Sequence, residues 1–584
     1  MSSEESKDNP PVLMIPLSDE EEDIGLTPLT RPGTPLIIGT KQRLRPHEIL
    51  VSPPTSKDDS HTPWPLSQSA SDLLDKNIFS PRTLSRSSTV REPLATATAI
   101  KLEDTTIEDL VFEPEKLVRL RRWILTIVVV DFDLELGPTV VSVFPSLTLS
   151  HLERENIAFS SFPDSAQFDQ GSQTHSFRMR ETDHTKDDTL RDDHARPLSN
   201  DGFIYGYSHF TQKKDRSSKR GYKQRSLVLL SQFPYPTLFT ELISTLGPAF
   251  LTHRGPMLEA ACHNIASWPD HKLGIRVELG FMGNALLVEL PVGFDEQQMQ
   301  TVSSTPDLRK PHPLLAASPP QHLPPLTVFS ASISHLWSIW ECLVLSEPIL
   351  VFGTSPTMTS QAIWWLRDFM RPMPLAGDFR PYFTIHDKDH ATLVNQNAPQ
   401  AGLLLGVTNP FYDGTCKHWP HQLSLGASSQ HPSLGNQTPL PGPSPGWKTK
   451  THKRYISKDR SLLKSLEKAL LKPDSDARTH RSERDPALAL RRHFASRTTE
   501  FLVPLNRYLN TLIPSPSSSM YPTQKMKRFN ENDFFATLKS HGSPLPFKSN
   551  SKQKEFYERW LKSPGFGVWL AKQEEMVEAA LRQR

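Results

Sequence analysis

The chain has 584 residues, enough for roughly two to four domains, and its 66 Lys and Arg against 64 Asp and Glu give a formal net charge of +2. This balance excludes a globally basic protein that coats nucleic acid. Proline accounts for 53 of the 584 residues, about 9% against a usual ~5%, so we expect part of the chain not to pack. The three widely spaced cysteines exclude a disulfide scaffold or a Cys-rich zinc site, and with no signal-peptide or membrane-spanning pattern they predict a cytoplasmic protein.

Residues 1–114 are rich in Pro, Ser, Thr and acidic side chains. They are predicted to be a disordered tail, because such a segment cannot bury enough apolar surface to offset its ordering entropy. The tail contains Ser/Thr-Pro steps at Thr27, Thr34, Ser52 and Ser80. A solvated tail explains them, and proline-directed phosphorylation, which adds about −2 charge per event, is the alternative.

Residues 115–292 are expected to form a first α/β module. The stretch 123–132 is apolar at successive positions, which indicates a strand covered on both faces, and the Gly-Pro step at 137–138 marks a hairpin turn. The helix predicted at 236–246 is expected to end there, because a second Gly-Pro step follows at 247–248. Further strands are predicted at 139–144, 176–180, 203–210, 224–232, 274–279 and 285–290, and further helices at 151–159 and 258–268.

Residues 293–325 are rich in Pro and Ser and are predicted to link the first module to a central α/β module at 326–426. The central module alternates helices and strands, which favours a parallel sheet with helices on its faces. A second Pro/Ser/Gly-rich stretch, 427–455, is predicted to be a flexible insertion, and 456–584 to be helical. Strands are predicted at 348–352, 382–385 and 403–407, and helices at 333–344, 357–369, 486–512, 531–540, 552–562 and 566–582.

The search for catalytic motifs gives mostly negative results. Phosphate-binding glycine loops, kinase signatures and zinc-protease motifs are absent from the sequence. Residues 353–357 (GTSPT) resemble a hydrolase nucleophile turn, but Thr stands in place of the second glycine and Pro356 removes the amide that would stabilise an oxyanion. We therefore interpret Ser355 as a helix N-cap. His386-Asp387 could be half of a catalytic triad, but without a nucleophile a structural or interface pair is the better interpretation.

The histidines show no ligand spacing typical of zinc. His418 and His421 flank a Trp-Pro step, but no companion pair of cysteines follows. We therefore assign no metal and no cofactor.

Residues 213–225 (KKDRSSKRGYKQR) are strongly basic and are predicted to form the tip of a hairpin between two strands. A solvated hairpin and contact with an anionic membrane, at about 1 kcal/mol per basic residue near the surface, are equally good interpretations. Nucleic acid is not expected as a partner, because stacking aromatic residues are missing between the charges. The candidate membrane contacts are Lys213, Lys214, Arg216, Lys219, Arg220, Lys223 and Arg225.

Several long motifs occur in the order found in one protein family. They are GFIYGY at 202–207, KRGYKQRSLVLL at 219–230, LEAAC at 258–262, DFRPYFTIHD at 378–387, GVTNPF at 406–411 and HWPH at 418–421. From about residue 120 to about residue 580 the chain resembles DENN-domain proteins, in particular the branch called DENN-domain-containing protein 6. The tail and the stretches near 182–200, 295–325 and 427–450 depart from the family pattern.

The resemblance implies a longin-like α/β module, a DENN α/β module with a parallel sheet, and a helical C-terminal part. It also implies a guanine-nucleotide exchange factor for a Rab-type small GTPase on endosomal or recycling membranes, which needs no covalent chemistry of its own. We infer GTPase contacts at strand ends where the modules would meet: Asp378, Arg380, Tyr382, His386, Asp387, Asn409 and Phe411. The alternatives are that Arg380 holds a carboxylate between the modules and that Phe411 belongs to the core.

Two other functions compete with nucleotide exchange. A non-catalytic trafficking adaptor or Rab effector is the main alternative, because longin-like folds also serve as binding modules and fold does not fix function. A lipase-like hydrolase centred on Ser355 is disfavoured by the missing glycine and by Pro356.

Overall fold

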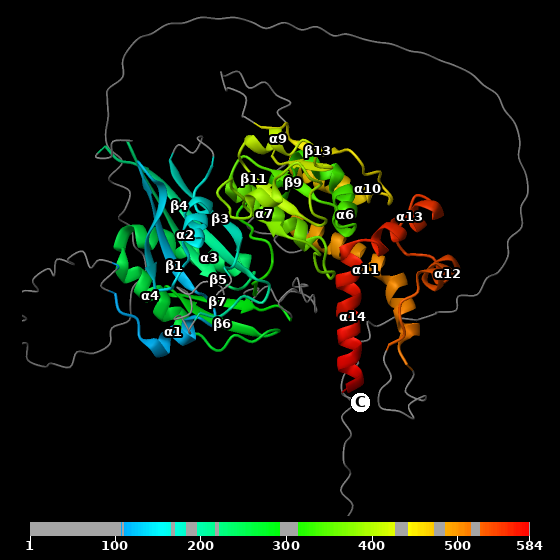
Figure 1. Cartoon of the computed structure of the whole chain (residues 1–584), viewed down its shortest axis with the longest axis horizontal. Helices are drawn as coiled ribbons and strands as arrows, with labels where there is room; N and C mark the ends of the chain where they lie inside the picture. The colour runs from blue at the N-terminus through cyan, green and yellow to red at the C-terminus, as the bar shows by residue number, and fades with distance from the viewer. Residues whose placement is uncertain are drawn as a thin grey trace, which may run out of the picture. The chain divides into compact units, whose positions relative to one another are not determined.

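The computed structural model describes residues 107, 110–164, 170–182, 196–216, 221–292, 313–426, 442–471, 485–514 and 526–582 (Figure 1). All of them lie within one compact unit, Leu102–Arg584. The four Ser/Thr-Pro steps of the predicted tail lie outside the described residues. Among the helices in these ranges, none has the length and apolar content needed to cross a bilayer.

The first module is a five-stranded antiparallel sheet with helices on both faces (Figure 1), in the strand order β2-β1-β5-β4-β3. Its elements are α1 (Pro114–Leu120), β1 (Thr126–Asp133), β2 (Gly137–Phe144), α2 (His151–Ser160), β3 (Gly171–Arg180), β4 (Phe203–Lys214), β5 (Tyr222–Ser231), α3 (Pro236–His253) and α4 (Gly255–Ala266). Successive residues of a strand point to opposite faces. Ile127 and Val129 accordingly pack in the core with α3 and α4, whereas Val128 and Val130 pack in a separate cluster with α2. The prediction of a strand covered on both faces is confirmed.

Helix α3 continues through the Gly247-Pro248 step, so the prediction that it ends at Leu246 is wrong. Gly247 lies against the ring of His209 on β4, where a side chain would clash. The glycine therefore allows α3 to pack closely on the sheet and does not end the helix. Pro248 removes one helical hydrogen bond, but burial of Phe250 in the next turn favours continuing the helix.

A small second sheet adjoins the first module, in the order β6-β7-β8. Its strands are β6 (Arg276–Phe281), β7 (Asn284–Glu289) and β8 (Leu314–Leu315). Strand β8 lies within the predicted linker 293–325, and the amide of Thr237 on α3 donates to the carbonyl of the following residue, Ala316 (3.2 Å). The described end of that stretch, from residue 313, is therefore packed structure and not a free connection.

The second module contains a mixed sheet in the order β10-β11-β9-β12-β13, parallel except for the antiparallel β13, so the predicted parallel sheet is confirmed. Its elements are α5 (Pro325–Val328), the 3-10 helix η3 (Ser330–His335), α6 (Leu336–Val344), β9 (Ile349–Phe352), α7 (Pro356–Asp368), β10 (Phe379–Arg380), α8 (His390–Leu393), β11 (Leu404–Val407), α9 (Phe411–Thr415), β12 (His421–Ser424) and β13 (Gly446–Thr449). The strand predicted at 382–385 is wrong. These residues form a loop after β10, because Pro381 has no amide with which to continue the ladder. Strand β13 lies within the predicted insertion 427–455, whose described part begins at residue 442.

Beyond residue 456 the described chain is helical, as predicted. The helices are α10 (Arg460–Leu471), α11 (Pro486–Leu512), α12 (Glu531–His541), α13 (Asn550–Leu561) and α14 (Pro564–Arg582). Helix α11 docks on the second module through polar contacts as well as apolar ones. The indole nitrogen of Trp340 on α6 donates to Thr498 (3.0 Å), and Arg491 pairs with Asp368 of α7 (2.9 Å).

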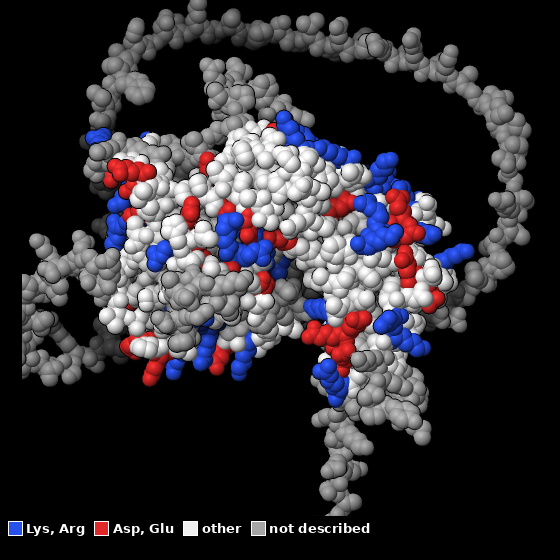
Figure 2. Space-filling model, viewed as in Figure 1, with Lys and Arg blue, Asp and Glu red and all other residues white. Residues whose placement is uncertain are grey.

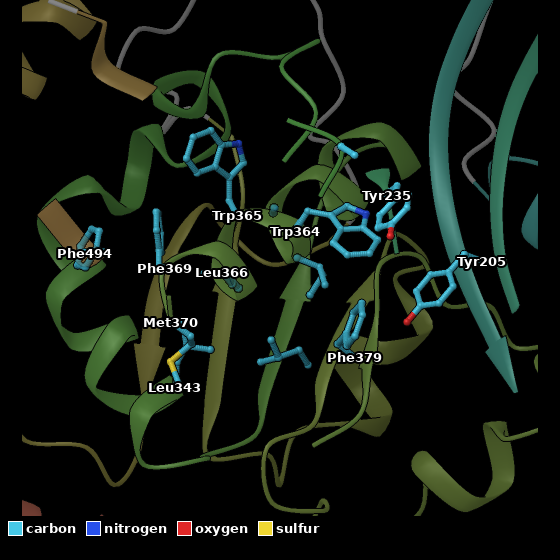
Figure 3. Close-up of a cluster of buried hydrophobic side chains, with 14 of the residues drawn as sticks. Tyr205, Tyr235, Leu343, Trp364, Trp365, Leu366, Phe369, Met370, Phe379 and Phe494 are labelled. Atoms are coloured by element: carbon cyan, nitrogen blue, oxygen red, sulfur yellow. The ribbon is translucent and has the colours of Figure 1, made fainter. Parts of the chain in front are cut away.

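One apolar core runs through all of these parts. Figure 3 shows Tyr205 of the first sheet beside Phe379 and Trp364 of the second module. In the same cluster Phe369 lies 4.5 Å from Phe494 of α11, measured between ring centroids. The first module, the second module and the helical C-terminal part therefore share buried aromatic side chains.

Candidate functional site

The two modules meet where strand β3 contacts helix α7. Strand β3 is an edge of the first sheet, and an uncovered edge tends to pair with other chains. Here the hydroxyl of Thr357 on α7 donates to the carbonyl of Thr174 (2.9 Å), and the indole nitrogen of Trp364 donates to the hydroxyl of Ser176 (2.8 Å). Helix α7 therefore covers the edge and fixes one module beside the other.

A set of charges, buried at its centre and partly exposed at its edge, continues this contact, and we call it the interface network. Its members are Arg178, Arg180, Asp201, Asp378, Arg380, Asp387 and Asp389. The fully buried Arg380 guanidinium binds the carboxylates of Asp378 (2.9 Å), Asp387 (3.3 Å) and Asp389. Arg178 of β3 reaches across from the first module to Asp378 (2.7 Å). Arg380 therefore holds carboxylates between the modules, the alternative that the sequence left open.

The interface network needs both modules, because the guanidinium groups of Arg178 and Arg180 in the first module meet carboxylates of the second. Burial raises the pKa of Asp387, and the charge of Arg380 opposes that rise. Removing one partner of a buried ion pair leaves an uncompensated charge, which is costly. The network therefore favours one alignment of β3 and β10.

Four of the predicted GTPase contacts lie inside this junction. Arg380, Tyr382 and Asp387 are buried and the Asp378 side chain nearly so. The Tyr382 hydroxyl donates to the carbonyl of Phe162 (3.0 Å) and accepts from the amide of Asp164 (2.9 Å). These side chains are engaged within the protein, which favours a role in aligning the modules over the predicted direct contact with a GTPase.

The other three predicted contacts, His386, Asn409 and Phe411, lie toward the surface. Phe411 is 50% exposed, and Ile385, beside His386, is 43% exposed. The side-chain oxygen of Asn409 accepts from the amide of Phe411 (3.0 Å) and so fixes the start of α9. These residues follow β10 and β11, at the carboxyl end of the parallel sheet, where α/β proteins commonly bind ligands.

Residues of the first module extend this exposed region. His386 stacks on Phe159 of α2, with ring centroids 3.6 Å apart. Phe159 in turn lies against Gly137 at the β1–β2 turn, beside the exposed Leu136. Phe411 lies near this region through His390, whose ring centroid is 6.2 Å from that of Phe411 and which interacts electrostatically with His386. We call Leu136, Phe159, Ile385, His386 and Phe411 together the seam surface. Leu136, Phe159 and Ile385 were not predicted, because an isolated apolar residue in a sequence carries no sign of its exposure.

His386 and Asp387 do not form a catalytic pair. His386 turns toward Phe159, whereas Asp387 turns toward Arg380. Partial burial lowers the pKa of His386, and the nearby Glu155 opposes that shift. The imidazole is therefore neutral at pH 7 and serves as a stacking surface.

Comparison with known proteins identifies the family. No family model matches the chain. It is 33% identical to Protein DENND6B from Homo sapiens over 474 residues, which cover 77% of this chain and 79% of that protein. The chain belongs to the DENND6 family of DENN-domain proteins. It is also 31% identical over 504 residues to Protein DENND6A from Gallus gallus (81% of this chain, 84% of that protein), and 27% identical over 532 residues to the Protein DENND6 homolog from Dictyostelium discoideum (77% and 70%).

The basic hairpin of this DENND6 chain is confirmed as a hairpin between β4 and β5. Lys213 pairs with Lys223 across the two strands, and both side chains are exposed. Arg225, by contrast, binds Asp131 of β1 through two hydrogen bonds of 2.5 Å, so it is not free for a membrane. Lys219 and Arg220 lie outside the described residues. Figure 2 shows Lys and Arg interspersed with Asp and Glu on the viewed face, rather than one uniform basic field.

The nucleophile-like turn at 353–357 of the DENND6 chain also has a structural explanation. The Ser355 hydroxyl accepts from the amide of Met358 (3.3 Å), with Pro356 as the first residue of α7, so the N-cap interpretation is confirmed. Within the described ranges, one group of side chains has donor atoms close enough to hold a metal ion: Cys342, Glu347 and His452. It is separate in sequence from the seam surface.

Proposed function

We propose that this protein is a guanine-nucleotide exchange factor that promotes GDP release from a Rab-type small GTPase. The observation that carries the proposal is the seam surface, where Phe159 of the longin-like module stacks on His386 of the DENN module, next to the exposed Ile385. The exposed Phe411 follows the neighbouring strand of the parallel sheet. Exposed aromatic and aliphatic side chains on rigid elements are the usual anchors of a protein interface. Membership of a DENN-domain family supports a small GTPase as the partner.

The mechanism requires no covalent step. An exchange factor works by binding the nucleotide-free GTPase more tightly than the loaded one. A nucleotide bound at picomolar affinity corresponds to about −16 kcal/mol, so contacts with the GTPase must offset a large part of that energy by moving its switch segments. The seam surface would supply those contacts, and the buried Arg380 would hold its two halves at fixed spacing.

Action on endosomal or recycling membranes is the finer part of the proposal. The exposed lysines of the β4–β5 hairpin, Lys213, Lys214 and Lys223, support contact with an anionic membrane at that end of the longin-like module. Such contact would place the seam surface near a membrane-anchored GTPase.

The direct test is release of labelled GDP from a panel of purified Rab GTPases. The full-length protein is expected to accelerate release from at least one member, and Ile385→Asp is expected to abolish the acceleration because it places a charge in an apolar contact. Val568→Asp, at a 44% exposed site on α14, is the matched control and should retain activity. If both variants accelerate GDP release equally, the seam surface is not the site that contacts the GTPase.

Nucleotide preference separates exchange from the adaptor or effector alternative. An exchange factor forms its stable complex with the nucleotide-free GTPase, whereas an effector prefers the GTP-bound form. Pull-down of each nucleotide state by the full-length protein distinguishes them. Preference for the GTP state, with no acceleration of GDP release from any panel member, would overturn the proposal.

A further inference from the structure

Three potential metal ligands meet inside the second module, and we call them the Cys342 cluster. Cys342 lies on α6, Glu347 in the turn before β9, and His452 in the segment after β13. One donor atom from each lies within 4.8 Å of the others. Cys342 is fully buried, Glu347 is buried and the His452 side chain is 1% exposed. The surrounding elements α6, β13 and α13 are labelled in Figure 1.

The hydrogen bonds of His452 leave one ring nitrogen for a ligand. Its Nε2 lies 2.7 Å from Oε2 of Glu341. The other oxygen of that carboxylate, Oε1, accepts from the amides of Tyr455 (3.0 Å) and Ile456 (2.6 Å). A carboxylate can only accept, so Nε2 carries the hydrogen. The Nδ1 atom of His452 is then a bare lone pair, buried and without a hydrogen-bond partner among the described residues.

This arrangement is the one that metal-binding histidines use. A ligating imidazole usually donates its other ring hydrogen to a carboxylate, which fixes the ring and makes the lone pair more basic. Glu347 is oriented in a similar way, because His421 lies 2.5 Å from its Oε2 and Arg559 of α13 binds its Oε1. Two of the three ligands are therefore held in position by outer partners.

The buried surroundings of the cluster also suit a bound cation. The carboxylates of Glu341 and Glu347 both lie beside it and accept hydrogen bonds from His452, His421 and Arg559. Zinc binding would displace the thiol proton of Cys342 to solvent, because the thiolate is the form that binds a metal.

We propose that the Cys342 cluster binds one Zn²⁺ ion through the Cys342 thiolate, the Glu347 carboxylate and His452 Nδ1, with water in the fourth position. A thiolate together with an imidazole selects zinc over the hard cations Mg²⁺ and Ca²⁺. Tetrahedral zinc sets its ligand atoms roughly 3.3–3.8 Å apart, so small side-chain rotations close the site. The bound ion would tie the segment around His452 to α6.

The first test measures zinc in the full-length protein. Protein produced with added zinc and dialysed against a weak chelator is expected to retain about one equivalent. Cys342→Ala should lose it, whereas Cys262→Ala, at an equally buried free cysteine of the first module, should keep it. Retention of the same zinc content by wild type and Cys342→Ala would overturn the proposal.

A second test does not depend on the fold of the cysteine variant. Cobalt added to metal-depleted wild-type protein should produce a thiolate-to-metal charge-transfer band, and His452→Ala should remove or shift it. Glu341→Gln keeps an acceptor for the His452 ring hydrogen but makes the His452 lone pair less basic. The variant should therefore bind the metal more weakly, because loss of such an outer partner typically costs about 10–100-fold in metal affinity. Absence of both stoichiometric zinc and the cobalt band from wild type would overturn the proposal.

Discussion

The buried junction between the modules and the seam surface beside it come from the same stretch of chain but have opposite character. At the start of the 378–387 motif, Asp378 and Arg380 are buried in ion pairs that bind the longin-like module. At its end, Ile385 and His386 face outward. The difference separates two roles within one motif, because charges already paired inside the protein align the modules, whereas exposed apolar groups remain available to a partner.

The comparison also explains why the junction is ionic. Apolar contacts tolerate sliding, whereas each guanidinium of the interface network must meet particular carboxylates. A shift of β3 against β10 would separate Arg178 from Asp378 and leave buried charges unpaired. The network therefore fixes the spacing between Phe159 and His386, the two halves of the seam surface.

The largest expected effect is a loss of stability when the buried interface network is disrupted. Arg380→Ala removes the cation that Asp378, Asp387 and Asp389 share, so it should lower the free energy of unfolding by about 3–5 kcal/mol. Denaturant titration of the full-length protein measures the loss. Arg180→Ala is the control, because its half-exposed side chain lies at the edge of the same network and should cost less than about 1 kcal/mol. Equal losses for the two variants would contradict the central place of Arg380.

Much of the fold could be predicted because its signals are local. The apolar run of β1, the Ser355–Pro356 start of α7 and the periodic C-terminal helices are all confirmed. The errors have two physical sources. At Gly247, close packing against the ring of His209 outweighs a local signal that usually ends a helix, so α3 continues. At Pro381, the missing amide ends β10 after two residues, although the apolar residues that follow favour a strand.

The candidate site was less predictable. Its residues were chosen from a family resemblance, and a resemblance in sequence does not indicate which side chains are buried. Phe411 and Arg380 stand in equally distinctive motifs, yet one is half-exposed and the other is fully buried. The Cys342 cluster was missed for a different reason. His452 lies more than a hundred positions after Cys342, so no ligand spacing in the sequence indicates the cluster. The fold brings the segment after β13 against α6, where His452 bonds to Glu341.

Substitution of Asp164, at the boundary between the junction and the seam surface, should give the next largest change in the free energy of unfolding. Burial raises the pKa of Asp164 to about 6 from an ordinary 3.8, and a hydrogen bond with Tyr382 opposes the rise. The stability that the protonated carboxyl contributes is present below pH 3.8 and is lost as the pH rises through about 6. Asp164→Asn should therefore be more stable than wild type by up to about 3 kcal/mol above pH 6, and the difference should vanish below pH 3.8. The free energy of unfolding of both proteins should be measured across this pH range. A constant difference between the two would contradict the raised pKa of Asp164.

The exposed side of the comparison predicts a change in activity without a change in stability. Phe411→Ala truncates a half-exposed ring, so the free energy of unfolding should change by less than about 0.5 kcal/mol. If Phe411 is an interface anchor, kcat/KM for GDP release should fall about thirtyfold, equal to about 2 kcal/mol. Met576→Ala, a comparably exposed apolar residue on α14, should leave both quantities unchanged. A large loss of stability in Phe411→Ala would instead make it a core residue.

The smallest expected effect concerns the basic hairpin, where the contrast between paired and free charges recurs. Lys213 is exposed opposite Lys223, whereas Arg225 is held by Asp131. Lys213→Gln should weaken binding to vesicles that contain phosphatidylserine by about fivefold, or about 1 kcal/mol, and the difference should shrink at high salt. Lys554→Gln, at an exposed lysine on α13, should have no effect. If both variants bind as wild type does, the hairpin is only a solvated loop, and membrane recruitment must come from another part of the chain or from the GTPase itself.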